Sequence, residues 1–177
     1  MLAVAFFAVL YVVVSVLLSS DKDARVMPTQ LVDLSTIKQG EHRIILWDGR
    51  PVIVYRRSLE DTQFLEVAHA EHRAVLNDPD SKRSRQPTWA LNAFRSKQPE
   101  WFISIGVGTD FSCPIGFSEA SNERVQQQPW RGGFTDDCRG SKYDLAGRVY
   151  KGQYATKNLI VPNYTIRGTT LVLGGSD

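Results

Sequence analysis

The chain has 177 residues and carries 21 basic against 19 acidic side chains, which gives a formal net charge of +2. That length holds one globular domain of about 100 to 150 residues and a small additional element. The near balance of charge provides no global field that would recruit nucleic acid, so no DNA or RNA partner is expected.

The small additional element is an apolar run at the start of the sequence. Leu2 to Leu18 is interrupted only by the polar atoms of Tyr11 and Ser15. As a helix it would be about 26 Å long, close to the hydrocarbon thickness of a bilayer. A basic leader and a small-residue cleavage site are both missing, so residues 1–20 are predicted to be a single-span transmembrane anchor rather than a signal peptide. The polar residues 21–28 are predicted to be a tether.

The body, residues 29–177, opens with a β pattern. Gln30 to Leu34, His42 to Trp47 and Pro51 to Arg56 alternate or cluster β-branched and aromatic residues. Asp48-Gly49 lies between the last two runs, and this dipeptide is typical of a two-residue hairpin turn. The sequence therefore predicts antiparallel strands from the start of the body.

One helix is predicted within the β pattern. Ser58 and Asp61 have the spacing of a capping box, and the stretch that follows has apolar residues at helical spacing as far as Leu76. His69 and His72 stand one turn apart on it. Because no third ligand accompanies them beyond nearby glutamates, an ordinary solvated helix face is favoured over a metal site.

The second half of the body continues as short strands after a charged loop. The loop, Asp78 to Pro87, contains several basic residues and is predicted to be solvated; the alternative is contact with anionic headgroups or an acidic partner. Trp101 to Val107 resumes the strand pattern, and every strong signal after Glu100 is β. We therefore expect a mainly β fold, a small antiparallel sandwich or barrel with one inserted helix.

The chain has two cysteines, Cys113 and Cys138, and each lies in a loop between apolar runs. In an exported domain two loop cysteines most simply form one disulfide. Such a bridge closes a loop of about 26 residues and would stabilise the fold by roughly 3.5 kcal/mol in the chain-entropy description. The alternative is a pair of free buried thiols.

The flanks of these cysteines resemble a known family. Ile105 to Gly116 reads IGVGTDFSCPIG, and Gly132 to Arg148 reads GGFTDDCRGSKYDLAGR. These frames are similar to C-T-H-x-G-C and C-P-C-H-G-S-x-[FY]-D-x-x-G-R, the two cluster loops of Rieske iron-sulfur proteins. Asp78 to Pro87, Pro99 to Trp101 and Asn158 to Tyr164 resemble the Rieske subunit of proteobacterial quinol:cytochrome c reductase, complex III. The resemblance implies a Rieske-like β head behind the anchor.

The resemblance also places the cluster ligands, in a cluster-binding subdomain at about residues 100–157. In the family each loop supplies one cysteine and one histidine to a [2Fe–2S] centre. The four corresponding positions here are Gly108, Asp110, Asp136 and Arg139. Glycine has no ligand atom, guanidinium stays protonated, and aspartate offers hard oxygens, so we expect no [2Fe–2S] cluster and no other cofactor. The remaining cysteine of each family loop forms a disulfide, which corresponds to Cys113 and Cys138.

Other positions in the loops follow from the same comparison. Asp110 and Arg139 replace two histidines that converge on one iron, so an ion pair between them is expected, with two separately solvated charges as the alternative. Ser141 and Tyr143 stand where the family hydrogen-bonds the cluster and its cysteine, and without a cluster they are expected to serve the fold. Residues 152–156 stand where the family has a proline-rich loop over the cluster.

These features imply a cluster-less, non-redox and non-enzymatic structural or assembly subunit of a respiratory membrane complex. The host implied by the resemblance is complex III or its supercomplex with a terminal oxidase, with cytochrome b, cytochrome c1 or oxidase subunits as partners and a dimeric state set by the host. The expected location is the inner membrane, with the head on the periplasmic or intermembrane-space side. The alternatives are a regulator that occupies the docking site of a true Rieske head, and a metal-binding module built on Asp110, Asp136 and Asp137.

Overall fold

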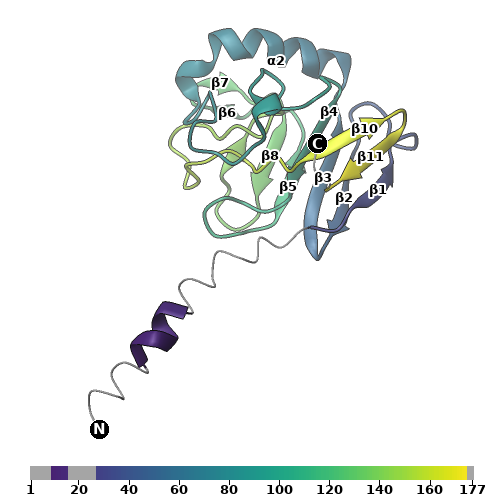
Figure 1. Cartoon of the computed structure of the whole chain (residues 1–177). Coiled ribbons are helices and arrows are strands. Elements are labelled where there is room, and N and C mark those ends of the chain that lie inside the picture. The colour runs from purple at the N-terminus through teal and green to yellow at the C-terminus, as the bar shows by residue number, and fades with distance from the viewer. Residues whose placement is uncertain (1–8, 16–26, 175–177) are drawn as a thin grey trace.

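The structure is a computed structural model and describes residues 9–15 and 27–174, apart from the side chains of residues 69 and 70. A short helix occupies residues 9–15 (Figure 1). In these described ranges no helix has both the length and the apolar character needed to cross a bilayer. The predicted anchor, residues 1–20, and the predicted tether, residues 21–28, lie mostly outside them.

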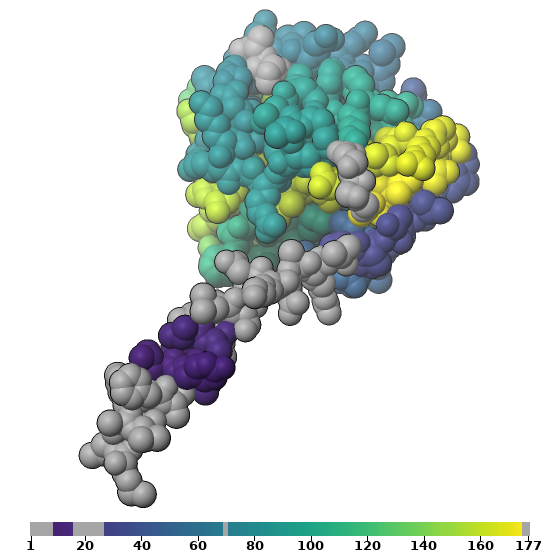
Figure 2. Space-filling view, in the orientation of Figure 1, coloured from purple at the N-terminus to yellow at the C-terminus, as the bar shows by residue number. Residues whose placement is uncertain are grey.

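The described head is mainly β, as predicted, and its strands pair antiparallel throughout. One three-stranded sheet has the order β1 (Gln30–Asp33), β11 (Thr170–Leu173), β10 (Tyr164–Arg167). A second has the order β2 (His42–Trp47), β3 (Arg50–Arg56), β4 (Trp101–Ile105). The first sheet joins the two ends of the head, and Figure 2 shows the yellow C-terminal strands seated against the first strands of the chain.

The third sheet positions the two cysteine loops. Its order is β5 (Ile115–Ser118), β8 (Gly133–Asp136), β9 (Lys142–Tyr143), and a small hairpin of β6 (Arg124–Val125) and β7 (Gln128–Pro129) lies between β5 and β8 in sequence. The β4–β5 loop and the β8–β9 loop therefore belong to neighbouring strands, which brings the two cysteine loops together.

The predicted hairpin is confirmed. Trp47 pairs with Arg50 across the turn, and Asp48 and Gly49 have φ values of 47° and 75°. Two consecutive residues in the left-handed region match the twist of the flanking strands, and glycine and aspartate tolerate that region better than most residues.

The inserted helix, α2 (Leu59–Glu71), begins where predicted and ends earlier. Ser58 and Asp61 form both hydrogen bonds of the capping box, at 3.1 and 2.7 Å. The prediction of helix as far as Leu76 is wrong: η1 (Arg73–Val75) follows, and Leu76 is extended and forms a bridge with Tyr150. Leu76 is buried there, so the tertiary contact outweighs the helical spacing.

Two buried arginines, Arg57 and Arg95, stabilise loops of the head by hydrogen bonds to backbone carbonyl oxygens. The Arg57 guanidinium is fully buried and donates to the carbonyl oxygens of Phe94, Pro99 and Leu145 at 2.8 to 3.0 Å. Burial lowers the pKa of Arg57 to about 10, which leaves it charged at neutral pH. Arg95 makes similar bonds to the carbonyl groups of residues 146, 147 and 159. Paired carbonyl acceptors compensate these buried charges.

The basic side chains of the charged loop from Asp78 to Pro87 are exposed, as predicted, and hydrogen bonds fix the backbone of the loop. The buried Asp78 carboxylate accepts hydrogen bonds from the amides of Lys82 and Arg83 and from the Ser84 hydroxyl, at 2.6 to 3.0 Å. The Asn158 side chain donates to the Asp78 carbonyl at 2.7 Å. The loop continues into η2 (Thr88–Ala90). Its basic side chains stay exposed while its backbone is fixed.

Candidate functional site

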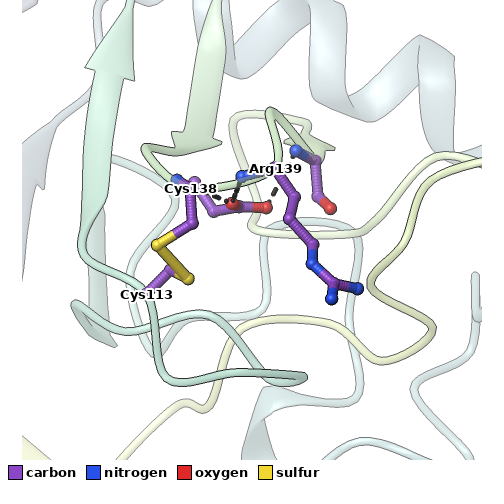
Figure 3. The surroundings of a disulfide bond; sticks show 5 residues. Cys113, Cys138 and Arg139 are labelled. Carbon is purple, nitrogen blue, oxygen red and sulfur yellow. Dashed lines mark hydrogen bonds between the residues drawn. A yellow bond between two sulfur atoms is a disulfide. The ribbon is translucent and has the colours of Figure 1, made fainter.

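Two cysteine loops meet at one end of the third sheet. The structure joins Cys113 and Cys138 in the predicted disulfide, with a Cα–Cα distance of 5.9 Å (Figure 3). The Gly108 amide donates to the Cys113 carbonyl at 2.7 Å, and the Asp137 amide donates to the Pro114 carbonyl at 3.0 Å. The two loops are thus held by one covalent bond and by backbone hydrogen bonds within and between them.

Asp136, at the end of β8, organises the second loop. Its side chain is buried, and its carboxylate accepts hydrogen bonds from the backbone amides of Cys138, Arg139 and Ser141 at 3.2, 2.7 and 2.8 Å. Burial raises the pKa of Asp136, but the hydrogen bonds outweigh it and hold the pKa below the ordinary value. An anionic carboxylate inside the loop therefore supplies the acceptor for its amides.

The Arg139 side chain extends away from the disulfide (Figure 3). Its guanidinium lies over the Phe111 ring, 3.9 Å from the ring centroid, and 5.0 Å from the Tyr154 ring centroid. Both rings are about two-thirds exposed, at 64% and 67%. The arginine therefore stacks with two aromatic rings on the surface where three loops meet.

The expected ion pair between Asp110 and Arg139 is not formed in the described part of the chain. The competing contacts explain the difference, because aromatic faces attract a guanidinium without requiring a carboxylate to be held beside it. Phe111 and Tyr154 had no role in the sequence-based site. Phe111 belongs to the first cysteine loop and Tyr154 follows β9, and their common contact with Arg139 emerges only from the fold.

Ser141 and Tyr143 are buried in the third sheet and its loop. The Ser141 hydroxyl accepts a hydrogen bond from the Ala155 amide at 3.2 Å, so it ties residues 151–157 to the cysteine loop. Burial raises the pKa of Tyr143 to about 12, and hydrogen bonding with Thr109 opposes that rise.

Comparisons with known proteins identify the family of the chain. The chain is 33% identical over 145 residues to the ubiquinol-cytochrome c reductase iron-sulfur subunit of Allochromatium vinosum, which covers 82% of this chain and 68% of that protein. This chain belongs to the Rieske iron-sulfur subunit family. It is also 33% and 35% identical to the mitochondrial Rieske subunits of the cytochrome b-c1 complexes of Schizosaccharomyces pombe and Neurospora crassa. Those matches cover 88% and 83% of this chain but only 58% and 54% of the relatives.

The chain was also compared with family models and with solved structures. No family model matches the chain. Among solved structures, a chain of a hyperthermophilic respiratory Complex III aligns with a TM-score of 0.48 and 19% identity, over 96% of this chain and 92% of that chain.

The resemblance predicts that Gly108, Asp136 and Arg139 stand at cluster-ligand positions of the family, and the structure shows what surrounds each of them. Gly108 does not have the left-handed backbone that would require glycine, and a Cβ atom there would meet its neighbours at 3.4 Å or more. A side chain is therefore sterically possible at Gly108. Asp136 directs its carboxylate to three amides, and Arg139 directs its guanidinium to two rings. Both remaining sulfur atoms are used in the disulfide.

The alternative of an aspartate-based metal site is not supported by the geometry. Among the described residues, no group of three or more histidine, cysteine, aspartate or glutamate side chains is placed to hold a metal ion. The Asp136 carboxylate faces the amides of its own loop. The other proposed pair, His69 and His72, includes a side chain outside the described residues.

Proposed function

We propose that this chain is a cluster-less, non-redox Rieske subunit that serves the structure or assembly of a complex III-type respiratory complex. One observation carries the proposal: the carboxylate of Asp136, at a position where the family places a cluster ligand, is engaged with three amides of its own loop. A residue of the chain itself therefore supplies the hydrogen-bond acceptor for these three backbone amides.

The donor set supports the same proposal. A [2Fe–2S] centre of this family needs two thiolates and two imidazoles. Gly108 contributes no side-chain ligand, Arg139 is a permanent cation, and two carboxylates are poor replacements for thiolate and imidazole. These residues do not fit the cluster, and we derive no electron-transfer step for this chain.

The proposed partners follow from the relatives. The mitochondrial relatives are subunits of cytochrome b-c1 complexes, and the bacterial relative is a subunit of ubiquinol-cytochrome c reductase. For this chain we propose cytochrome b-type and cytochrome c1-type neighbours, or oxidase subunits in a supercomplex. It would lie in the inner membrane with its head on the periplasmic or intermembrane-space side. The predicted anchor would pack against neighbouring helices, and the head would cover or bridge subunits.

Co-purification tests this assignment. A tagged full-length chain, expressed in its native membrane and extracted in mild detergent, is expected to elute together with haem-containing subunits, detected by their visible absorption. The Phe111→Ala and Tyr154→Ala variants report whether the exposed stack contributes to the contact. A parent chain that elutes alone under conditions in which the haem-containing complex itself stays intact would contradict the assignment.

The exposed stack of Phe111, Arg139 and Tyr154 also favours a second candidate function, a regulator that docks through this surface without carrying electrons. Deletion of the gene distinguishes the two. A structural subunit predicts loss of assembled complex, whereas a regulator predicts normal abundance and altered turnover per complex.

A further inference from the structure

A groove of about 1130 Å³ lies on the head, and Phe111, Arg139 and Tyr154 do not line it. It is bounded by the β2–β3 hairpin, by the end of the Asp78–Pro87 loop, by residues 160–163 and by Val107 and Ser112 of the first cysteine loop. Its apolar lining includes Trp47, Ile105 and Ile160. The proposed complex assembly does not account for this groove.

The charged side chains that line the groove are all basic. Arg50 and Arg85 both line it, and both are exposed. Within the described residues their guanidinium groups form no ion pair or hydrogen bond, and no acidic residue lines the groove. Unpaired guanidinium groups beside an apolar wall match a molecule with an anionic head and a hydrocarbon part. The anion would bind the guanidinium groups, and the hydrocarbon would be buried against the apolar side chains.

The groove lies where the chain enters the head. Met27 lines it, and the Trp47 indole donates to the Pro28 carbonyl at 2.7 Å. Only the eight residues 19–26 separate Met27 from the apolar run Leu2 to Leu18. Fully extended, they span at most about 28 Å. If that run enters a bilayer as predicted, the groove stays within reach of the headgroups.

We propose that this groove binds an anionic phospholipid, with the phosphate against Arg50 and Arg85 and the first part of an acyl chain along the apolar wall. The bound lipid would fix how the head sits on its membrane. An acidic protein segment would satisfy the two arginines as well, but the apolar wall and the short reach to the predicted anchor favour lipid. Arg50 and Arg85, which carry this proposal, lie outside both cysteine loops, so its failure would leave the proposed function unchanged.

The test is a calorimetric titration of the full-length chain in a non-ionic detergent. The probes are dihexanoyl phosphatidylglycerol, dihexanoyl phosphatidylcholine and glycerol 3-phosphate. We expect the phosphatidylglycerol to bind, and the paired change R50Q/R85Q to weaken it about 30-fold, since each basic residue near anionic lipid contributes about a factor of five. The matched control, R124Q/R167Q, removes two exposed charges outside the groove and is expected to change affinity less than about twofold.

Conservative replacement separates binding from folding. R50K/R85K keeps both charges and is expected to retain most of the affinity, and near-ultraviolet circular dichroism of each variant verifies the fold. Equal binding of phosphatidylcholine, equal binding of glycerol 3-phosphate, or an R50Q/R85Q variant that binds like the parent would each overturn the proposal. Self-association of the chain that depends on Arg50 and Arg85, without lipid selectivity, would also overturn it and assign the groove to contact between copies.

Discussion

Replacing Cys113 and Cys138 together by serine is expected to lower the free energy of unfolding by about 3.5 kcal/mol. The disulfide joins residues 25 positions apart, so its removal releases a long loop in the unfolded chain. Within the described residues, the bridge is the only disulfide between the two loops. Urea denaturation of the full-length chain in detergent, followed by tryptophan fluorescence, measures the loss.

The control for the disulfide is chemical. Reducing agent is expected to move the parent to the urea midpoint of C113S/C138S and to leave the double variant unchanged. A loss below about 1 kcal/mol would contradict the account, because a bridge across a loop of this length contributes more unless other contacts already hold the loops.

Replacing Asp136 by alanine is expected to cost about 2 to 3 kcal/mol of unfolding free energy, because three amides lose their acceptor and water reaches them only in part. Asp136→Asn keeps one acceptor oxygen and is expected to cost less. The neighbouring Asp137 is exposed, so Asp137→Ala is the matched control and is expected to stay within about 0.5 kcal/mol of the parent. A D136A variant as stable as D137A would remove the central role of this carboxylate.

The same carboxylate predicts a pH dependence with a definite sign. The pKa of Asp136 is lowered in the folded state relative to the ordinary value of 3.8. Its ionised form therefore stabilises the fold fully above that ordinary value, and the contribution is lost as pH falls through the lower folded pKa. Unfolding measured from pH 7 downward should show the difference between parent and D136N shrinking in acid. A difference that grows in acid would contradict the hydrogen-bonding scheme.

The features that the sequence predicts correctly on its own depend on interactions between neighbouring residues. The Asp48-Gly49 turn and the Ser58 capping box depend on neighbouring residues alone, and both form as expected. The pairing of Cys113 with Cys138 depends on long-range topology, and it was reached through the family frame as well as the loop positions. The family frame also predicts which four positions correspond to the cluster ligands.

The failures depend on contacts across the fold. The helix was extended to Leu76 because the apolar spacing continues, but Leu76 pairs with Tyr150, far along the chain. Arg139 was assigned a carboxylate partner by charge, whereas the fold places two aromatic rings around it. One signal was available and unused: an aspartate followed by turn residues often accepts the amides two and three positions ahead, as Asp136 does.

The most direct test of the central claim is a determination of iron and acid-labile sulfide in the full-length chain, purified from its native membrane under anaerobic conditions. The account predicts only background iron and sulfide, in a protein whose disulfide is intact and whose partners are retained. About two iron atoms and two sulfides per chain, with the visible absorption of a [2Fe–2S] centre, would contradict it.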